Sequence, residues 1–130
     1  MMSAAVAWHD VENGSYDADL FLWRELAAAA GGPILDLGSG TGRVAAALAA
    51  QGHEVVALDA DPELLAVLRD RTPAVETVVA DARDFDLGRT FALVLAPMQL
   101  AQILGGPAER VAMLEGVHAH LIPGGTFAAA

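Results

Sequence analysis

Aspartates and glycines at the ends of apolar runs are the residues of this sequence best suited to binding a ligand. Asp36 interrupts the apolar run 34–37, and three glycines, Gly38, Gly40 and Gly42, follow at alternate positions. Glycine permits positive φ and lets a ligand approach the main chain without meeting a Cβ, while the first turn of a following helix offers N–H groups. The stretch predicts a cradle for a nucleotide-type or anion-type ligand, with an ordinary strand-to-helix turn as the alternative.

Two more aspartates follow later apolar runs. Asp59 comes after the run 54–58, and Asp81 comes after the run 75–80. Because ligands bind at the carboxyl ends of the strands in open α/β sheets, we expect these carboxylates and Asp36 to converge on one crevice. Asp59 is placed to accept hydrogen bonds from the hydroxyls of a ribose, and the alternative is a solvated acid.

Asp61 has a structural explanation of its own. It precedes Pro62, and this pair suits the N-cap and the first position of a helix. A metal site of the Asp-x-Asp type, formed by Asp59 and Asp61, is therefore disfavoured. His118 and His120 stand two residues apart on an expected helix and point in different directions, so no metal site is predicted.

Strands alternate with helices along the chain, because apolar runs lie between helical patterns that begin at proline or end at glycine. The expected strands are 34–37, 54–58, 75–80, 91–96 and 126–130. The expected helices are 17–30, with Asp17 or Asp19 as its cap, 44–51, 62–71, 100–104 and one that opens at Pro107. Such an order predicts right-handed βαβ units in an α/β fold: a three-layer sandwich with a Rossmann-like, mostly parallel sheet that ends after its fifth strand.

Composition narrows the class of protein. The chain has 130 residues, of which 55% are hydrophobic and 18% charged, a balance that favours one folded domain over disorder. We expect a lead-in segment, residues 1–16, and a domain, residues 17–130. The net charge of −10 argues against nucleic acid as a partner. No apolar run is long enough for a membrane span, and the absence of cysteine favours the cytoplasm.

Five short motifs, in this order and spacing, resemble those of class I S-adenosylmethionine-dependent methyltransferases. They are Leu-Asp-Leu-Gly-Ser-Gly-Thr-Gly at 35–42, Val-Ala-Leu-Asp at 56–59, Val-Ala-Asp-Ala at 79–82, Phe-Ala-Leu-Val at 91–94 and Leu-Ile-Pro-Gly-Gly at 121–125. The resemblance implies S-adenosylmethionine as cofactor and a small-molecule methyl acceptor. It implies direct displacement at the methyl carbon, for which a dedicated general base is unnecessary, and no catalytic residue is assigned.

The same resemblance assigns roles to the residues of the crevice. The backbone around Gly38 and Gly40 would face the methionine part of the cofactor, Asp36 would help to hold its amino group, and Asp59 would take the ribose hydroxyls. Asp81 would accept from the adenine amino group.

Four further residues complete the expected site. The Ala82 N–H would meet the adenine ring, and Tyr16 resembles the tyrosine that often covers the bound cofactor. Met98 and Gln99 would line the acceptor pocket. They stand where some amine-methylating branches carry Asn or Asp followed by Pro-Pro and an aromatic residue, so this part of the pattern is absent. His9 is a weaker candidate for a base.

The family's sheet has seven strands, whereas five are expected here. Either the chain is shortened or a partner supplies the rest, and an exposed fifth-strand edge would favour a homodimer. Two alternatives stay open: a non-catalytic S-adenosylmethionine-binding fragment, and an NAD(P)-dependent oxidoreductase. The oxidoreductase is disfavoured because Arg43 stands where its fingerprint requires glycine.

Overall fold

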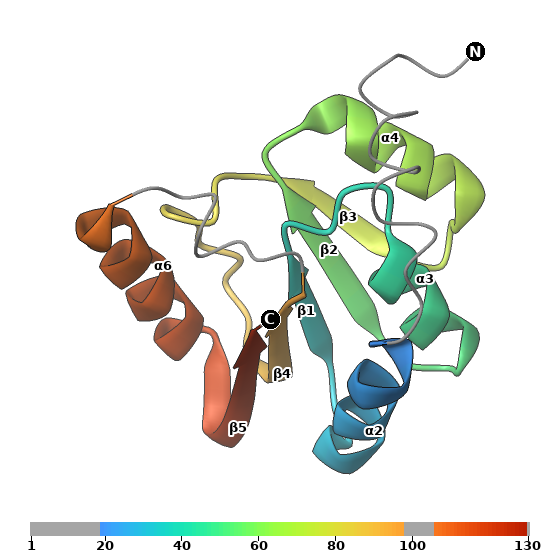
Figure 1. Cartoon of the computed structure of the whole chain (residues 1–130), viewed down its shortest axis with the longest axis horizontal. Coiled ribbons are helices and arrows are strands. Elements are labelled where there is room, and N and C mark those ends of the chain that lie inside the picture. Colours follow the sequence, from blue (N-terminus) through green and yellow to red (C-terminus); the bar gives the residue numbers. More distant parts are fainter. Residues whose placement is uncertain (1–18, 98–105, 130) are drawn as a thin grey trace.

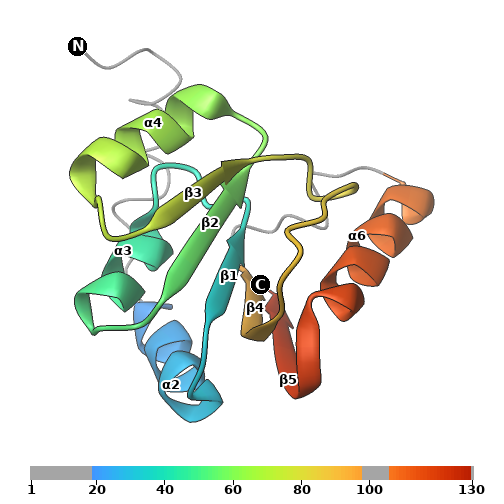
Figure 2. The same cartoon turned by 180° about the vertical axis from the view of Figure 1, so that it is seen from behind.

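The structure is a computed structural model that describes residues 19–97 and 106–129. Its elements in chain order are α2 (Leu20–Ala30), β1 (Ile34–Leu37), α3 (Arg43–Ala50), β2 (Val55–Asp59), α4 (Pro62–Arg71), β3 (Glu76–Val79), β4 (Phe91–Ala96), α6 (Pro107–Ala119) and β5 (Leu121–Ala129). The five strands form one sheet in the order β3-β2-β1-β4-β5, and every neighbouring pair is parallel. Figures 1 and 2 show this sheet from opposite directions.

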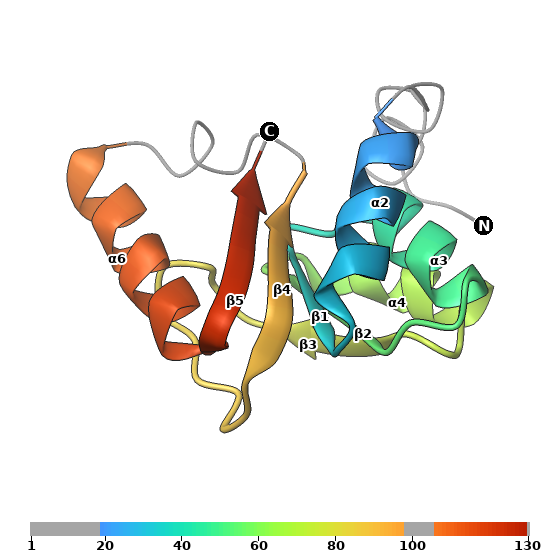
Figure 3. The same ribbon diagram turned by 90° about the horizontal axis from the view of Figure 1, so that it is seen from below.

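Helices cover both faces of the sheet, which gives the three layers that the sequence predicts. One apolar core joins the sheet to α2, α3 and α4, with Trp23, Leu48 and Leu68 among its buried members. A second core joins the opposite face to α6 through Met113 and Val117. Figure 3 shows α6 on one side of the strands and α2 and α3 on the other. Trp23 and Met113 are both buried as packing residues of these cores.

Strand β1 is the centre of the sheet and is buried along its whole length. Ile34 pairs with Val55 on one side and with Leu93 on the other. Side chains alternate along a strand, so Ile34 belongs to the core under α2, α3 and α4, and Leu35 belongs to the opposite core. The same alternation places Asp36 on the face that α3 covers.

Most element bounds agree with the sequence-based expectations, and two features differ. Strand β5 begins at Leu121 instead of Thr126, because Leu121 already pairs with Phe91 and the Pro-Gly-Gly segment forms an irregularity before Thr126 pairs with Leu93. Asp19 occupies the N-cap position of α2, but its side chain makes no capping bond. The expected helix 100–104 and Asp17 lie outside the described residues.

His120 connects the segment between β3 and β4 to the end of α6 through hydrogen bonds of its imidazole ring. It is buried, its Nδ1 lies 2.7 Å from the Gly116 carbonyl oxygen, and its Nε2 accepts from the Leu87 N–H at 3.0 Å. The Phe85 ring lies 4.6 Å from the imidazole between centroids. His118 is exposed, so the two histidines do face different directions.

Gly42 ends the glycine turn at a point where no side chain fits. Its φ is +90°, and a Cβ there would lie 2.1 Å from Cδ1 of Leu68, which is fully buried. Gly52 has nearly the same backbone conformation, with φ +91°, but nothing lies within 4 Å of its missing Cβ. A comparison of alanine substitutions at Gly42 and Gly52 therefore distinguishes the cost of backbone strain, which both carry, from the cost of steric overlap, which only Gly42 carries.

We expect Gly42→Ala to lower the free energy of unfolding by about 1–3 kcal/mol more than Gly52→Ala does, because only the first substitution forces Leu68 to move. Gly52→Ala carries the strain of a left-handed non-glycine residue alone, about 1–2 kcal/mol. Urea unfolding of both variants measures the difference. Equal losses would show that the contact between α4 and the turn is not tightly packed.

Candidate functional site

The glycine turn is bonded directly to the end of the neighbouring strand β2. The N–H groups of Gly38 and Ser39 donate to the carbonyl oxygen of Leu58, at 2.8 and 3.2 Å. The N–H of Gly40 donates to Oδ2 of Asp59 at 2.9 Å. Gly38, Gly40 and Gly42 all have positive φ, so the turn requires glycine at each of these alternate positions.

The Asp59 carboxylate accepts hydrogen bonds from two backbone N–H groups. While Oδ2 accepts from Gly40, Oδ1 accepts from the Asp61 N–H at 2.9 Å. Each carboxylate oxygen offers about two acceptor positions, so these bonds leave capacity for hydroxyl donors of a ligand. The sequence predicted the position of Asp59 at the carboxyl end of a strand, and the structure adds that it fixes the turn.

Asp61 has the capping role that the sequence predicts. Its side chain accepts from the N–H groups of Glu63 and Leu64 at the start of α4. Within residues 19–97 and 106–129, no group of three or more His, Cys, Asp or Glu side chains is arranged to hold a metal ion.

Asp36 is a buried carboxyl group without hydrogen-bond partners. It is 1% exposed, and neither of its oxygens has a partner. Burial and, to a smaller extent, the nearby charge of Asp59 raise the pKa of Asp36, the charge of Arg43 opposes them, and the net result is a pKa of about 8. A contact with the Ala45 N–H also lowers this pKa, but it does not meet the geometry of a hydrogen bond.

Ser39, inside the glycine turn, is a second buried polar group of this kind. Its Oγ is buried and has no hydrogen-bond partner. Leaving a buried polar group unsatisfied costs about 1–3 kcal/mol, and such groups in native structures call for an explanation. A bound ligand that carries hydrogen-bond donors would satisfy both Asp36 and Ser39, so the turn fits an amino-acid-like or nucleoside-like group.

Arg43 and Asp19 form an ion pair beside the turn that the sequence analysis did not foresee. Nη1 of Arg43 lies 2.6 Å from Oδ1 of Asp19, and Nη2 lies 2.9 Å from Oδ2. The indole Nε1–H of Trp23 donates to the same Oδ2 at 2.7 Å. The bonds from Arg43 hold the pKa of Asp19 below its usual range, although burial opposes this shift.

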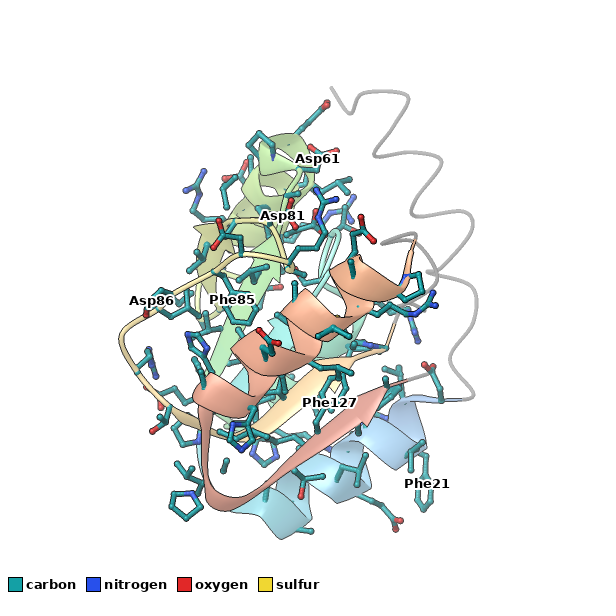
Figure 4. The ribbon with its side chains drawn as sticks, turned by 90° about the vertical axis from the view of Figure 1, so that its left-hand side faces the viewer. Phe21, Asp61, Asp81, Phe85, Asp86 and Phe127 are labelled. Carbon is teal, nitrogen blue, oxygen red and sulfur yellow. The ribbon has the colours of Figure 1, made fainter. Side chains whose placement is uncertain are left out.

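Asp81 lies just after β3, as predicted, but its carboxylate is engaged with a neighbour. Arg83 donates to both oxygens from its side chain, the shortest contact being 2.6 Å, and its backbone N–H donates to Oδ1 at 2.8 Å. These bonds lower the pKa of Asp81 to about 2. Ala82 is buried. Figure 4 shows Asp81 and Asp61 at the end of the sheet where β3 and β2 terminate.

The structure thus brings Asp36, Gly38, Gly40 and Asp59 together, with Asp81 and Ala82 after the adjacent strand. Tyr16, Met98 and Gln99, together with His9, lie outside the described residues. The sequence did not single out Ser39, and it did not predict that Asp19 and Arg43 pair with each other. Ser39 could have been predicted as a site residue, because it is a polar residue between two glycines of the turn. No local sequence pattern links Asp19 to Arg43.

Comparison with protein families shows the family to which the chain belongs. Residues 34–125 match the family described as a methyltransferase domain. The chain belongs to this family. Methyltransferases of this kind use S-adenosylmethionine, in agreement with the resemblance noted in the sequence.

Two relatives are named as an N-terminal methyltransferase and an N,N-dimethyltransferase. The chain is 38% identical to the cypemycin N-terminal methyltransferase of Streptomyces sp. over 97 residues, which cover 73% of this chain and 40% of the relative. It is 37% identical to the dTDP-3-amino-3,6-dideoxy-alpha-D-glucopyranose N,N-dimethyltransferase of Streptomyces fradiae over 92 residues, covering 71% and 36%. The chain thus spans about two fifths of the length of these relatives.

Solved structures give the same result. An S-adenosylmethionine-bound amino pentose methyltransferase from Micromonospora echinaspora superposes with a TM-score of 0.81 and 30% identity, covering 98% of this chain and 55% of the other. The glycopeptide N-methyltransferase MtfA, complexed with S-adenosyl-L-methionine, superposes with a TM-score of 0.75 and 30% identity, covering 87% and 54%. Among the helices that the structure describes, none combines the length and apolar character needed to cross a membrane.

Asp59→Ala should weaken the binding of S-adenosylhomocysteine at least about 10-fold, because it removes charged hydrogen bonds worth about 1.5–3 kcal/mol each. Asp61→Ala is the matched control: it loses a helix cap, about 0.5–2 kcal/mol of stability, but keeps the N–H that donates to Asp59. Isothermal titration calorimetry of both variants makes the comparison. Unchanged affinity of Asp59→Ala would remove this residue from the site.

Asp36 should make the protein less stable as the pH rises from about 4 to about 8. The unfolded chain releases this proton near 3.8, whereas the folded protein keeps it until about 8. Between these values the folded state binds the extra proton, so the free energy of unfolding falls with rising pH, by up to about 5 kcal/mol over the window.

Urea unfolding at several pH values, compared with Asp36→Asn, isolates this contribution because the amide does not titrate. The wild-type value should fall relative to that of Asp36→Asn across the window. Parallel curves for the two proteins would mean that Asp36 is ionised in the folded state.

Proposed function

We propose that this chain is the cofactor-binding part of an S-adenosylmethionine-dependent methyltransferase that methylates an amino nitrogen of a small molecule. The observation that carries the proposal is Asp36, a buried carboxyl group with no partner beside a three-glycine turn. A cationic donor group of a ligand would satisfy it. The amine-directed relatives support the choice of nitrogen.

S-adenosylmethionine supplies a methyl group activated by a sulfonium. Among the chain's own residues, Asp36 holds the ammonium group of the methionine part, next to the backbone of Gly38 and Gly40. Asp59 accepts from the ribose hydroxyls. Asp81 accepts from the adenine amino group, and the Ala82 N–H donates to the adenine ring.

The charge of the crevice suits this ligand better than a dinucleotide. Asp36 and Asp59 act on each other electrostatically, and a pyrophosphate would place further negative charge beside them. The ammonium and sulfonium groups of S-adenosylmethionine bring positive charge instead. Arg43, which stands where the dinucleotide fingerprint has glycine, is bonded to Asp19. These features support the methyltransferase over the NAD(P)-dependent alternative.

Tyr16, Met98 and Gln99 keep their proposed roles, the first over the cofactor and the others in the acceptor pocket. Proximity and alignment of the amine with the methyl carbon supply the main rate enhancement, so no general base is assigned. We also propose a cytoplasmic location and a homodimer through the free edge of β5, which lies at the end of the sheet.

Calorimetric titration with S-adenosylmethionine, S-adenosylhomocysteine and NAD tests the cofactor. We expect saturable binding of the first two, no binding of NAD, and loss of binding in Asp36→Asn. Binding of NAD alone, or of none of the three by a folded chain, would contradict the proposal.

Transfer of a radiolabelled methyl group to a panel of primary and secondary amines, with alcohols as controls, tests the reaction. Product from amines alone is expected. Cofactor binding without transfer to any acceptor would favour the non-catalytic fragment.

A further inference from the structure

The ion pair between Asp19 and Arg43 joins the starts of two helices beside the glycine turn. Asp19 directly precedes α2, and Arg43 is the first residue of α3, immediately after Gly42. Their side chains are 18% and 11% exposed, and two hydrogen bonds connect them. Trp23, buried in the core, adds a third bond to the Asp19 carboxylate. The guanidinium is therefore held in one place.

The first turn of α3 lies against Asp36, because the Ala45 N–H contacts its carboxyl group and Arg43 opens the same helix two residues earlier. Asp59, at the end of β2, makes Asp36 harder to ionise, and Arg43, at the start of α3, makes it easier. The strand residues paired with Asp36 are Ala57 on β2 and Leu95 on β4, and neither carries a charge. Among the described side chains, Asp59 and Arg43 are those whose charges act directly on Asp36.

We infer that Asp19 and Arg43 are positioning residues of the cofactor site: their ion pair holds a positive charge beside the glycine turn and so sets how readily Asp36 becomes the carboxylate that receives the cofactor's ammonium group. The inference rests on the proposed function for the identity of the ligand. The electrostatic link itself is a property of the free protein.

The two residues act in opposite directions on Asp36. The positive charge of Arg43 stabilises the ionised carboxylate, and the negative charge of Asp19 offsets part of that effect. Removing the charge of Arg43 leaves Asp36 protonated to higher pH. Removing the charge of Asp19 leaves the guanidinium uncompensated, so Asp36 ionises at lower pH.

The test is a carbon-13 NMR titration of carboxyl groups in the ligand-free protein, with the Asp36 resonance assigned by its loss in Asp36→Asn. We expect the Asp36 midpoint to rise in Arg43→Gln and to fall in Asp19→Asn, each by about half to one pH unit. Arg43→Lys, which keeps the charge, should return the midpoint toward the wild-type value. Far-ultraviolet circular dichroism reports whether each variant remains folded.

Arg89→Gln is the matched control, because it removes an arginine that lies far from Asp59 along the strands. Arg89 pairs with Glu54, which directly precedes β2, and with Glu76, the first residue of β3, whereas Asp59 is the last residue of β2. Arg89→Gln should leave the Asp36 midpoint unchanged. Shifts in the same direction for Arg43→Gln and Asp19→Asn, or none in either, would overturn the inference.

The affinity for S-adenosylhomocysteine should also depend on pH. The pH at which it changes should be higher in Arg43→Gln and lower in Asp19→Asn than in the wild type. If the wild type does not bind this ligand, the proposed function fails. The ligand-free titration still decides the electrostatic link.

Discussion

The bond between the Asp59 carboxylate and the Gly40 N–H is the constraint on which the rest of the site depends. It holds the glycine turn against the end of β2 at 2.9 Å. The position of the turn decides where α3 begins, and the start of α3 decides where Arg43 lies. A single acceptor at the end of one strand therefore fixes both the glycine turn and the start of α3.

This arrangement places an unsatisfied carboxyl group at the centre of the sheet. Asp36 lies between two apolar neighbours on adjacent strands, where an apolar residue would be more stable. The fold tolerates it because the two large apolar cores lie on either side of the same strand. Stability is lowered at the one position where a ligand needs a charge, which is a common feature of functional sites.

Much of the fold could be predicted from local sequence, because apolar runs and helix signals lie within a few residues of each other. The strand 34–37 and the helix 62–71 have the predicted bounds. The early start of β5 could not be predicted, since Pro-Gly-Gly is typical of a turn and the pairing of Leu121 depends on distant Phe91. The bond from Arg43 to Asp19 was also missed, because it joins long side chains of residues 24 positions apart without a local pattern.

The central position of β1 also has a consequence for the order in which the chain can fold. Its partner β2 follows after one short helix, whereas its other partner, β4, comes only after α4 and β3 have been completed. Contacts between residues distant in sequence form slowly, because a long loop must close before they are made. Closure of the shorter loops between β1 and β3 therefore favours an order in which Asp36 and Asp59 come together before β4 and β5 dock.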